Sequence, residues 1–464
     1  MTATGARAPD LARDLAAIVG DDHVRVDAGA RTVYGRDATP QYQGVPDAVV
    51  LPGSADQVAA VLRLAGERGV PVVPRGSGTN LSAATVPQAG GIVLALTRMD
   101  RLIELDRENL VAVCQPAVTT ARLVAAAAEH NLLYPPDPGS RTTATIGGNV
   151  STCAGGLRGL KYGVTRDYVL GAEVVLASGE IIHCGGRVMK DVAGYDLVRL
   201  LCGSEGTLGV ITELTLRLVP APEDAGTGLA YFDTLAAAGR AVSRVLAGGV
   251  LPATLEFLDR TTVRTVEDFA HVGLDTDAGA VLIFGQDGTP ETVARDMERI
   301  ADACRAEGAN DVTVASSHDE AEAILEARRA ALPSLSRLAP MTILEDATVP
   351  RARLAEMVER IEAIAARHEL VIGTFGHAGD GNLHPTCVVD PGDGDAIERV
   401  HHAFAEIFEA ALEMGGTITG EHGIGLAKLP FLEARLGAAQ VALLRRIKAA
   451  FDPAGILNPG KLGS

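Results

Sequence analysis

The chain has few cysteines, and no two of them form a C-x-x-C pair. Cysteine-ligated iron–sulfur clusters need closely spaced thiolates, so this scatter excludes a cluster of the usual spacing. A disulfide framework is not indicated either, and reduced, mostly buried thiols in a cytoplasmic protein are the better interpretation. The cysteines are Cys114, Cys153, Cys184, Cys202, Cys304 and Cys387.

Long apolar runs are missing as well. Gly, Arg or Asp interrupts every apolar stretch before it reaches the roughly 18 residues that a transmembrane helix needs. The segment 1–20 carries Asp10, Arg13 and Asp14 within an amphipathic pattern, whereas a secretory signal has an uncharged apolar centre. We therefore expect a cytoplasmic protein with no transmembrane segment.

Basic residues are too few to balance the acidic ones. The 41 Lys and Arg residues stand against 59 Asp and Glu, for a net charge of −18. Such a chain repels nucleic-acid phosphates, and no basic run offsets that repulsion, so we expect no nucleic-acid partner. Apolar residues are plentiful at 47%, and a length of 464 residues predicts two or three folded domains.

The first 220 residues have the pattern of an α/β layer. Ala48–Leu51 is a short strand, and Ser54 with Gln57 forms a capping box that starts a helix ending at Gly69. The strand Val70–Val73 follows at once, which completes a βαβ unit. Further strands are predicted at Ile92–Leu96, Leu110–Cys114, Val169–Leu176 and Ile181–His183, with a helix over Thr120–His130 and a hairpin turn at Ser178-Gly179.

A second domain should begin after Pro220-Ala221-Pro222, because prolines end a strand and stiffen a linker. The pattern that follows predicts helices on one face of an antiparallel sheet. Its strands include Ala280–Phe284 and Asp311–Ala315, and its helices are Glu291–Glu307, Asp319–Ala331, Leu354–Arg367 and Ala396–Glu413. The tail contains one more helix, Ala438–Ala450.

Three glycine-rich stretches lie in the first domain: Arg75–Asn80, Pro138–Gly156 and Gly203–Thr212. Glycine lets the backbone approach a ligand and aim consecutive N–H groups at phosphate oxygens, while Ser and Thr add donors without bulk. Three such stretches in one domain indicate a long dinucleotide with a pyrophosphate. None is a G-x-G-x-x-G that leads directly into a helix, so a Rossmann NAD site is not supported.

A second constellation runs from His377 to His384. Histidines seven residues apart would face opposite sides of a straight strand, but Gly379 and Gly381 permit a bend that brings both to one point. Imidazole is a common ligand of Zn, Mn and Fe, and a carboxylate such as Glu421 completes sites of this kind. The alternative is that these histidines lie in loops and are capped by the backbone.

Together these motifs resemble the FAD-linked 2-hydroxy acid dehydrogenases. This is the D-lactate dehydrogenase and glycolate oxidase flavoprotein-subunit branch of the vanillyl-alcohol oxidase fold family, and the resemblance extends from about Pro46 to Lys461. It implies an α+β fold: a two-part FAD-binding domain (residues 1–221), a substrate cap of antiparallel sheet and helices (222–415), and a C-terminal helical segment (416–464) that packs back on the first domain. The motifs that carry it are Arg75-Gly76-Ser77-Gly78-Thr79, Thr145-Ile146-Gly147-Gly148-Asn149, Gly203 to Thr212, His377 to His384 and Glu421-His422-Gly423.

The resemblance implies FAD as the cofactor. Some relatives attach the flavin through a histidine at the position of Thr79, and because threonine has no imidazole nitrogen, we predict non-covalent FAD. Asn458 and Lys461 near the C-terminus are predicted to return to the flavin, although a solvated Lys461 is the alternative. The other predicted FAD contacts are Arg75, Gly76, Ser77, Gly78, Thr79, Asn80, Pro138, Gly139, Ser140, Thr145, Gly147, Gly148, Asn149, Ser151, Thr152, Ala154, Gly206 and Ile211.

The resemblance further implies that His377, His384 and Glu421 hold a divalent metal, Zn or Mn, and that Asn382 contacts the substrate. His422 is the expected catalytic base, with a fourth metal ligand as the alternative. When hydride leaves C2 of a hydroxy acid for the flavin, the hydroxyl proton must leave too. A metal that binds the hydroxyl lowers its pKa, and a neutral histidine can accept the proton.

Arg328 matches the arginine that binds the substrate carboxylate in this family, since a guanidinium can donate two parallel hydrogen bonds to it. Relatives that act on 2-hydroxyglutarate need a second cation, but the segment Thr342–Asp346 offers Leu344 and two acids. This favours a small D-2-hydroxy monocarboxylate such as lactate, glycolate or a longer aliphatic acid, with D-2-hydroxyglutarate as the alternative.

Two rival functions share this fold: a flavin-dependent alkyl-glycerone-phosphate synthase, and a non-catalytic subunit of an oxidase complex. An intact set of His377, His384, Glu421 and His422 argues against the second. Because no iron–sulfur motif is present, electrons must pass to an external acceptor. A quinone, an electron-transfer flavoprotein, an iron–sulfur subunit or oxygen would serve, and the chain itself could form a homodimer.

Overall fold

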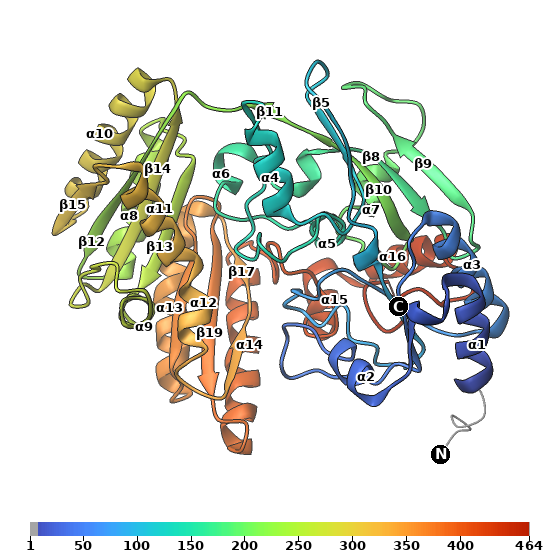
Figure 1. Ribbon diagram of the computed structural model, residues 1–464. Helices are drawn as coiled ribbons and strands as arrows, with labels where there is room; N and C mark the ends of the chain where they lie inside the picture. The colour runs from blue at the N-terminus through green and yellow to red at the C-terminus, as the bar shows by residue number, and fades with distance from the viewer. Residues whose placement is uncertain (1–7, 464) are drawn as a thin grey trace.

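A computed structural model describes residues 8–463, which form three main sheets (Figure 1). After helix α1 (Ala8–Val19) and the short helix α2 (Ala28–Tyr34), the first sheet has the order β1-β2-β4-β3, with β2, β4 and β3 parallel. Its strands are β1 (Val24–Arg25), β2 (Ala48–Val50), β3 (Val72–Arg75) and β4 (Ile92–Ala95).

Helix α3 (Ala55–Arg68) connects β2 to β3, which confirms the predicted βαβ unit. Ser54 caps the helix by accepting a hydrogen bond from the backbone N–H of Gln57 (3.3 Å). The reciprocal bond of the capping box goes elsewhere, because Gln57 Oε1 accepts from Gly53 N (2.7 Å). Gly69 ends the helix at a φ of +61°, in the left-handed region that glycine adopts easily.

The second sheet is antiparallel, so the α/β pattern expected for the first 220 residues holds only for the first sheet. Its order is β5-β6-β10-β8-β9, and the predicted turn at Ser178-Gly179 joins β8 to β9. A tight turn of this kind can join only antiparallel strands. The strands are β5 (Leu102–Asp106), β6 (Val111–Cys114), β8 (Val169–Val175), β9 (Ile181–Gly185) and β10 (Val210–Arg217).

Four helices accompany the second sheet: α4 (Thr120–Ala128), α5 (Ile146–Thr152), α6 (Gly159–Tyr162) and α7 (Leu197–Leu201). A two-stranded pairing of β7 (Leu132–Leu133) with β11 (Val219–Pro220) precedes the third sheet, whose first strand begins at Asp224.

The third sheet forms the cap, with the order β15-β12-β14-β13-β18-β19-β16 and with β17 also paired to β19. All neighbouring strands run antiparallel. They are β12 (Asp224–Phe232), β13 (Thr254–Asp259), β14 (Ala280–Gly288), β15 (Asp311–Val314), β16 (Met341–Leu344), β17 (Ala347–Thr348), β18 (Ile372–His377) and β19 (Asn382–Val389).

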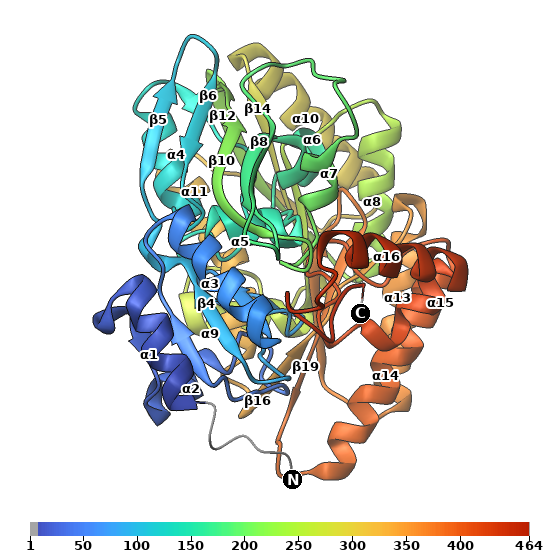
Figure 2. The same cartoon turned by 90° about the vertical axis from the view of Figure 1, so that its right-hand side faces the viewer.

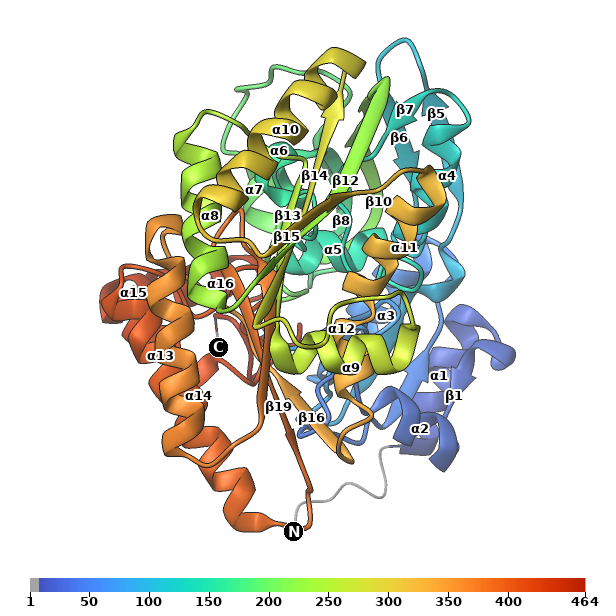
Figure 3. The ribbon, with the colours of Figure 1, turned by 90° about the vertical axis from the view of Figure 1, so that its left-hand side faces the viewer.

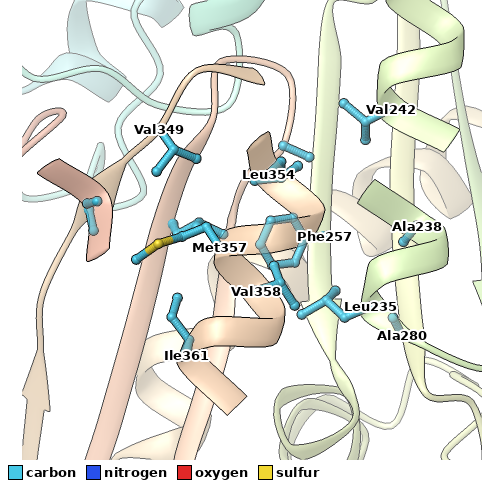
Figure 4. Close-up of a cluster of buried hydrophobic side chains, with 14 of the residues drawn as sticks. Leu235, Ala238, Val242, Phe257, Ala280, Val349, Leu354, Met357, Val358 and Ile361 are labelled. Atoms are coloured by element: carbon cyan, nitrogen blue, oxygen red, sulfur yellow. The ribbon is translucent and has the colours of Figure 1, made fainter. Parts of the chain in front are cut away.

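Helices cover both faces of this sheet, so the prediction of helices on one face is wrong. One group consists of α8 (Leu235–Ala247), α10 (Pro290–Ala306), α13 (Leu354–Arg367) and α14 (Gly394–Glu413), and the other of α9 (Arg260–Ala270), α11 (His318–Arg329) and α12 (Ala331–Leu335) (Figures 1 and 3). Successive strand residues alternate between two cores, since Phe232 packs with the first group and Tyr231 with the second. Figure 4 shows part of the first core, where Phe257, Val358 and Leu235 lie next to one another.

The C-terminal segment returns to the first domain (Figure 2). Its helix α15 (Leu432–Leu436) contributes Leu432 to the cap core. Helix α16 (Ala438–Phe451) contributes Val441 to the cap core and Phe451 to the core of the second sheet. Beyond α16 the chain lies beside β3, where Val72 N donates to Ile456 O and Asn458 N donates to Val72 O, both at 2.8 Å. All six cysteines are free, and no helix within residues 8–463 is long and apolar enough to cross a bilayer.

Candidate active site

A large cavity lies between the first domain and the cap, and the predicted FAD-binding residues line it. Eighteen of the twenty, all except Asn458 and Lys461, contribute to its wall. The opposite wall is formed by Glu421 and His422 of the C-terminal segment and by the cap residues Arg328, Arg329, Leu332, Pro333, Leu344, Phe375, His377 and His384. The fold therefore brings the glycine-rich stretches and the histidine constellation to opposite sides of one space.

The glycine-rich wall is held by side chains that point away from solvent. Arg75 ends β3, and its buried guanidinium donates to Arg36 O (2.6 Å) and to Thr85 Oγ1 (3.2 Å). Gly78 has a φ of +80°, and a Cβ there would lie 2.0 Å from Arg75 Nη2. The positive φ disfavours every residue except glycine at position 78, and a Cβ there would also displace the Arg75 guanidinium.

The histidine constellation forms a buried cluster around Glu421. Glu421 Oε1 lies 3.1 Å from His377 Nε2 and 3.3 Å from His384 Nε2, and the three ligand atoms lie within 4.8 Å of one another. The hairpin of β18 and β19 explains this convergence, because it pairs His377 with Asn382 and Phe375 with His384. Glu421 Oε2 accepts from Gly155 N (3.1 Å), so the cluster is attached to the glycine-rich wall.

Glu256 joins this cluster to Arg328. It lies on β13 directly opposite His377, whose Nδ1 is 2.8 and 2.9 Å from the two carboxylate oxygens. Arg328 Nε donates to Glu256 Oε2 (2.8 Å), and its Nη2 lies 2.7 Å from the same oxygen. One buried carboxylate therefore fixes the orientation of a histidine ring and of a guanidinium that face the same cavity.

His422 stacks on His384, with 5.0 Å between the ring centroids and 12° between the planes. Its Nδ1 lies 3.5 Å from Asp346 Oδ1 and its Nε2 lies 3.9 Å from Glu421 Oε1. Its carbonyl oxygen accepts from Asn80 Nδ2 (3.2 Å) and from Ser82 Oγ (3.0 Å), which ties it to the first domain. Burial lowers the pKa of His422 to about 4, so the imidazole is neutral near pH 7.

Asp346 organises the loop that carries Glu421 and His422. Its Oδ2 accepts from the backbone N–H groups of Gly420 (2.7 Å), Glu421 (2.8 Å) and His422 (3.3 Å). Its Oδ1 forms an ion pair with the fully buried Lys428, which also lies 3.3 Å from Glu345. Although burial raises the pKa of Asp346, the neighbouring His422 and Lys428 hold it below its usual range.

Comparison with known proteins shows the family of this chain. The family "FAD linked oxidases, C-terminal domain" matches residues 221–462, and "FAD binding domain" matches residues 46–185. The chain is 53% identical over 453 residues to the glycolate oxidase subunit GlcD of Bacillus subtilis (98% of this chain and 96% of that one). The chain belongs to the FAD-linked oxidases. This FAD-linked oxidase is also 40% identical over 418 residues to the D-lactate dehydrogenase of Archaeoglobus fulgidus (89% and 90% of the two chains).

The fold agrees with this assignment. The crystal structure of p-cresol methylhydroxylase with substrate bound superimposes with a TM-score of 0.84 at 18% identity, covering 99% of this chain and 97% of that one. The predicted α+β fold of the vanillyl-alcohol oxidase type is therefore confirmed, and FAD is the cofactor of this oxidoreductase.

Three residues of the FAD-linked oxidase that the sequence predicts to contact the substrate or FAD do not line the cavity. Asn382 Oδ1 accepts from Thr348 Oγ1 (2.9 Å), which supports the turn beside the histidine cluster. Asn458 Nδ2 donates to Ala84 O (2.9 Å) and Glu205 O (2.7 Å), and Lys461 Nζ donates to Val86 O (2.7 Å). Ala84 and Glu205 line the cavity, so Asn458 supports the wall from behind it. Direct contact of these residues with substrate or FAD stays a prediction.

Sequence reasoning missed Glu256, Lys428 and Glu205, and gave Asp346 no role beyond its charge. Glu205 accepts from the backbone N–H groups of Ile424 (2.6 Å) and Gly425 (2.8 Å), so it joins the glycine-rich wall to the loop after His422. The only local signal for Glu256 is an acid within an apolar strand. Buried acids and lysines are rare unless they are paired, so an acid at such a position indicates a buried cationic or hydrogen-bonding partner.

Replacing Gly147 with alanine should weaken FAD binding by about tenfold to a hundredfold. Its Cβ would lie 2.5 Å from Pro116 Cβ and 3.1 Å from Pro116 O, and overpacking of this kind costs about 1–3 kcal/mol. The measurement is the FAD dissociation constant of apoprotein, followed by quenching of flavin fluorescence. Gly186→Ala is the matched control, because nothing lies within 4 Å of its Cβ. Unchanged FAD affinity in Gly147→Ala would contradict the assignment of Gly147 to the wall that binds FAD.

Proposed function

We propose that this chain oxidises a small D-2-hydroxy monocarboxylate to the 2-keto acid, with bound FAD and with a divalent metal, Zn or Mn, held by His377, His384 and Glu421. The observation that carries the proposal is the convergence of these three side chains with His422 and Arg328 on one wall of the FAD cavity. The relatives named glycolate oxidase subunit and D-lactate dehydrogenase support this substrate class.

The donor set fits a dication. Two imidazole nitrogens and one carboxylate oxygen are a common protein site for Zn, and the partner of the outer His377 nitrogen is a carboxylate, as is usual for metal-binding histidines. Burial works against a charged imidazole, but Glu256 and Glu421 raise the pKa of His377 well above its usual range. The pocket therefore favours a positive charge, which a metal ion would supply.

The protein side chains have separate tasks in this reaction. Bound FAD supplies the hydride acceptor and the bound metal a Lewis acid for the substrate hydroxyl. Glu256 orients Arg328 through Nε and Nη2, which leaves Nη1 to donate to the substrate carboxylate. Asp346 faces His422 Nδ1, which leaves Nε2 as the atom that accepts the hydroxyl proton.

The charges around the site favour a monocarboxylate over D-2-hydroxyglutarate. Arg329 also lines the cavity, but both of its terminal nitrogens are already held, Nη2 by Asp137 (2.9 Å) and Nη1 by Glu326 (2.6 Å). Lys428 is fully buried and paired with Asp346 and Glu345. Both cations are therefore already neutralised by acids of the protein.

Electrons then pass to an external acceptor, a quinone, an electron-transfer flavoprotein or an iron–sulfur subunit, in keeping with the subunit name of the Bacillus relative.

Anaerobic mixing of the purified holoenzyme with D- and L-2-hydroxy acids tests the proposal. We expect lactate, glycolate or 2-hydroxybutyrate to bleach the oxidised flavin absorbance. Dialysis against a chelator should slow this reduction by at least about a hundredfold, because the hydroxyl pKa is no longer lowered, and Zn or Mn should restore it. If every hydroxy acid leaves bound FAD oxidised, the dehydrogenase function is wrong. The synthase or non-catalytic subunit then becomes the better hypothesis.

A further inference from the structure

Four charged side chains form a closed ring between the cap and the glycine-rich wall. Arg329 Nη2 lies 2.9 Å from Asp137 Oδ2, and Arg329 Nη1 lies 2.6 Å from Glu326 Oε1. Arg141 closes the ring, because its Nη1 lies 3.4 Å from Asp137 Oδ1 and its Nη2 lies 3.2 Å from Glu326 Oε1. Positive and negative groups alternate, so each of these four contacts is attractive. Two members belong to the first domain and two to the cap.

The ring is buried on one side and exposed on the other. The side chains of Asp137 and Arg329 are each 7% exposed, whereas that of Glu326 is 59% exposed. Although burial works against a charged guanidinium, Asp137 and Glu326 raise the pKa of Arg329. Salt screens a buried ion pair less than an exposed one, and loss of one buried partner leaves the other charge uncompensated. The pair of Asp137 and Arg329 is therefore the firm part of the ring.

Asp137 is fixed to the glycine-rich wall. It directly precedes residues 138–140, which line the FAD cavity. Its carbonyl oxygen accepts from Leu157 N (3.3 Å) and packs so closely on Gly156 that a Cβ there would lie 2.1 Å from it. The carboxylate of Asp137 therefore has a set position relative to the surface that the sequence predicts to bind FAD.

Arg329 is fixed to the substrate side of the cavity. It lies in the last turn of α11, directly after Arg328, whose Nη1 is left for the substrate carboxylate. Glu256 on β13 holds Arg328 from the cap sheet, and Asp137 holds Arg329 from the first domain. The last turn of α11 is thus held from both sides, which sets the distance between the proposed carboxylate anchor and the glycine-rich wall.

This distance matters because the two reactants are held by different domains. In the proposed function the substrate carboxylate binds Arg328 of the cap, whereas FAD binds the first domain. Reacting atoms must approach to about 3–3.5 Å, and a misplacement of about 1 Å can cost about a hundredfold in rate. A contact that fixes the cap against the glycine-rich wall can therefore control the rate without touching the substrate.

We propose that Asp137 is a positioning residue: through Arg329 it holds the last turn of α11, and with it Arg328, at the distance from the glycine-rich wall that hydride transfer requires. This inference rests on the proposed oxidation of 2-hydroxy acids. The contact contributes to the rate of flavin reduction and little to substrate affinity, because Glu256 orients Arg328 without help from Asp137.

Asp137→Asn in the holoenzyme tests the inference, since asparagine keeps the shape of the side chain and removes its charge. The rate of flavin reduction at saturating substrate should fall by about tenfold to a hundredfold, as measured by anaerobic stopped-flow. The dissociation constant of oxalate, which has no C–H bond to oxidise, should stay within about threefold of wild type. Perturbation of the oxidised flavin absorbance measures that constant, and the FAD content should be unchanged. A purely structural role would lower stability and leave the saturating rate of the folded protein intact.

A double-mutant cycle with Arg329→Gln shows whether the two residues act through one contact. If they do, the double variant should reduce flavin about as slowly as either single variant. Arg329→Lys keeps the charge but lacks the fork that spans Asp137 and Glu326, so its rate should lie between those of wild type and Arg329→Gln. Asp302→Asn is the matched control with wild-type rates, because Asp302 is an exposed acid that pairs with Arg305 of its own helix.

The outcomes separate this inference from the proposed function. If Asp137→Asn reduces flavin at the wild-type rate, the inference fails and the proposed function stands. If Arg329→Gln weakens oxalate or FAD binding by more than about tenfold while Asp137→Asn does not, Arg329 binds a ligand itself and the inference is overturned. Should Asp137→Asn not fold, a wild-type rate in Arg329→Lys overturns the inference instead. If no 2-hydroxy acid reduces the wild-type flavin, the proposed function fails, and the inference fails with it.

Discussion

Replacing His422 with asparagine should slow flavin reduction by the preferred 2-hydroxy acid by about a thousandfold. A positioned general base contributes about 10²- to 10⁴-fold, and the asparagine amide cannot accept the hydroxyl proton. The neutral state of His422, imposed by burial, makes its Nε2 available for that proton. The measurement is the rate of flavin bleaching in anaerobic stopped-flow experiments at saturating substrate.

The control must separate proton transfer from metal binding. FAD and metal contents should be unchanged in His422→Asn, and the exposed His402 provides a matched His402→Asn control with wild-type rates. Loss of the metal in His422→Asn would instead make His422 a fourth ligand. A reduction rate within about tenfold of wild type would contradict its role as the base.

Replacing Lys428 with methionine should lower the free energy of unfolding by about 3 kcal/mol. Removing one partner of a buried ion pair leaves the other charge uncompensated, which costs about 3–5 kcal/mol. Asp346 is fully buried, but its carboxylate would still accept hydrogen bonds from the backbone N–H groups of Gly420, Glu421 and His422. Because these bonds compensate part of the lost ion pair, we expect a cost at the lower end of this range. Urea denaturation of the holoenzyme, followed by flavin fluorescence and circular dichroism, measures the shift of the midpoint.

A double variant distinguishes the ion pair from lost packing. Lys428→Met with Asp346→Asn should be more stable than Lys428→Met alone, because the unpaired carboxylate is gone. Lys190→Met changes an exposed lysine and should alter stability by less than about 0.5 kcal/mol. A Lys428→Met protein that unfolds at the wild-type urea concentration would show that the pair contributes little.

Local sequence motifs predicted many of the residues that line the cavity. Glycine-rich stretches signal close backbone approach at their own positions, so Arg75–Asn80 and Thr145–Thr152 could be assigned from the sequence alone. The histidine constellation is also local, because one hairpin carries His377 and His384. The local signal for Glu421 is its place next to His422 in a glycine turn, and the family resemblance assigns it the same role.

The residues that sequence reasoning missed are paired across large separations. Glu256 meets His377 because β13 pairs with β18, and Lys428 meets Asp346 because the C-terminal segment returns to the cap. No local pattern encodes either register. The prediction of helices on one face of the cap sheet overlooked the apolar run Ala280–Phe284, whose residues are buried on both faces. A continuous apolar strand indicates burial on both.

The return of the C-terminal segment to β3 has a consequence for biosynthesis. Ile456 and Asn458 flank Val72, and Asn458 supports the wall at Ala84 and Glu205. A nascent chain that has emerged only as far as the glycine-rich stretches lacks this support, although its first two sheets are already translated. We therefore expect firm flavin binding only after the segment around Asn458 has been synthesised, which would make cofactor loading a late step in the maturation of this enzyme.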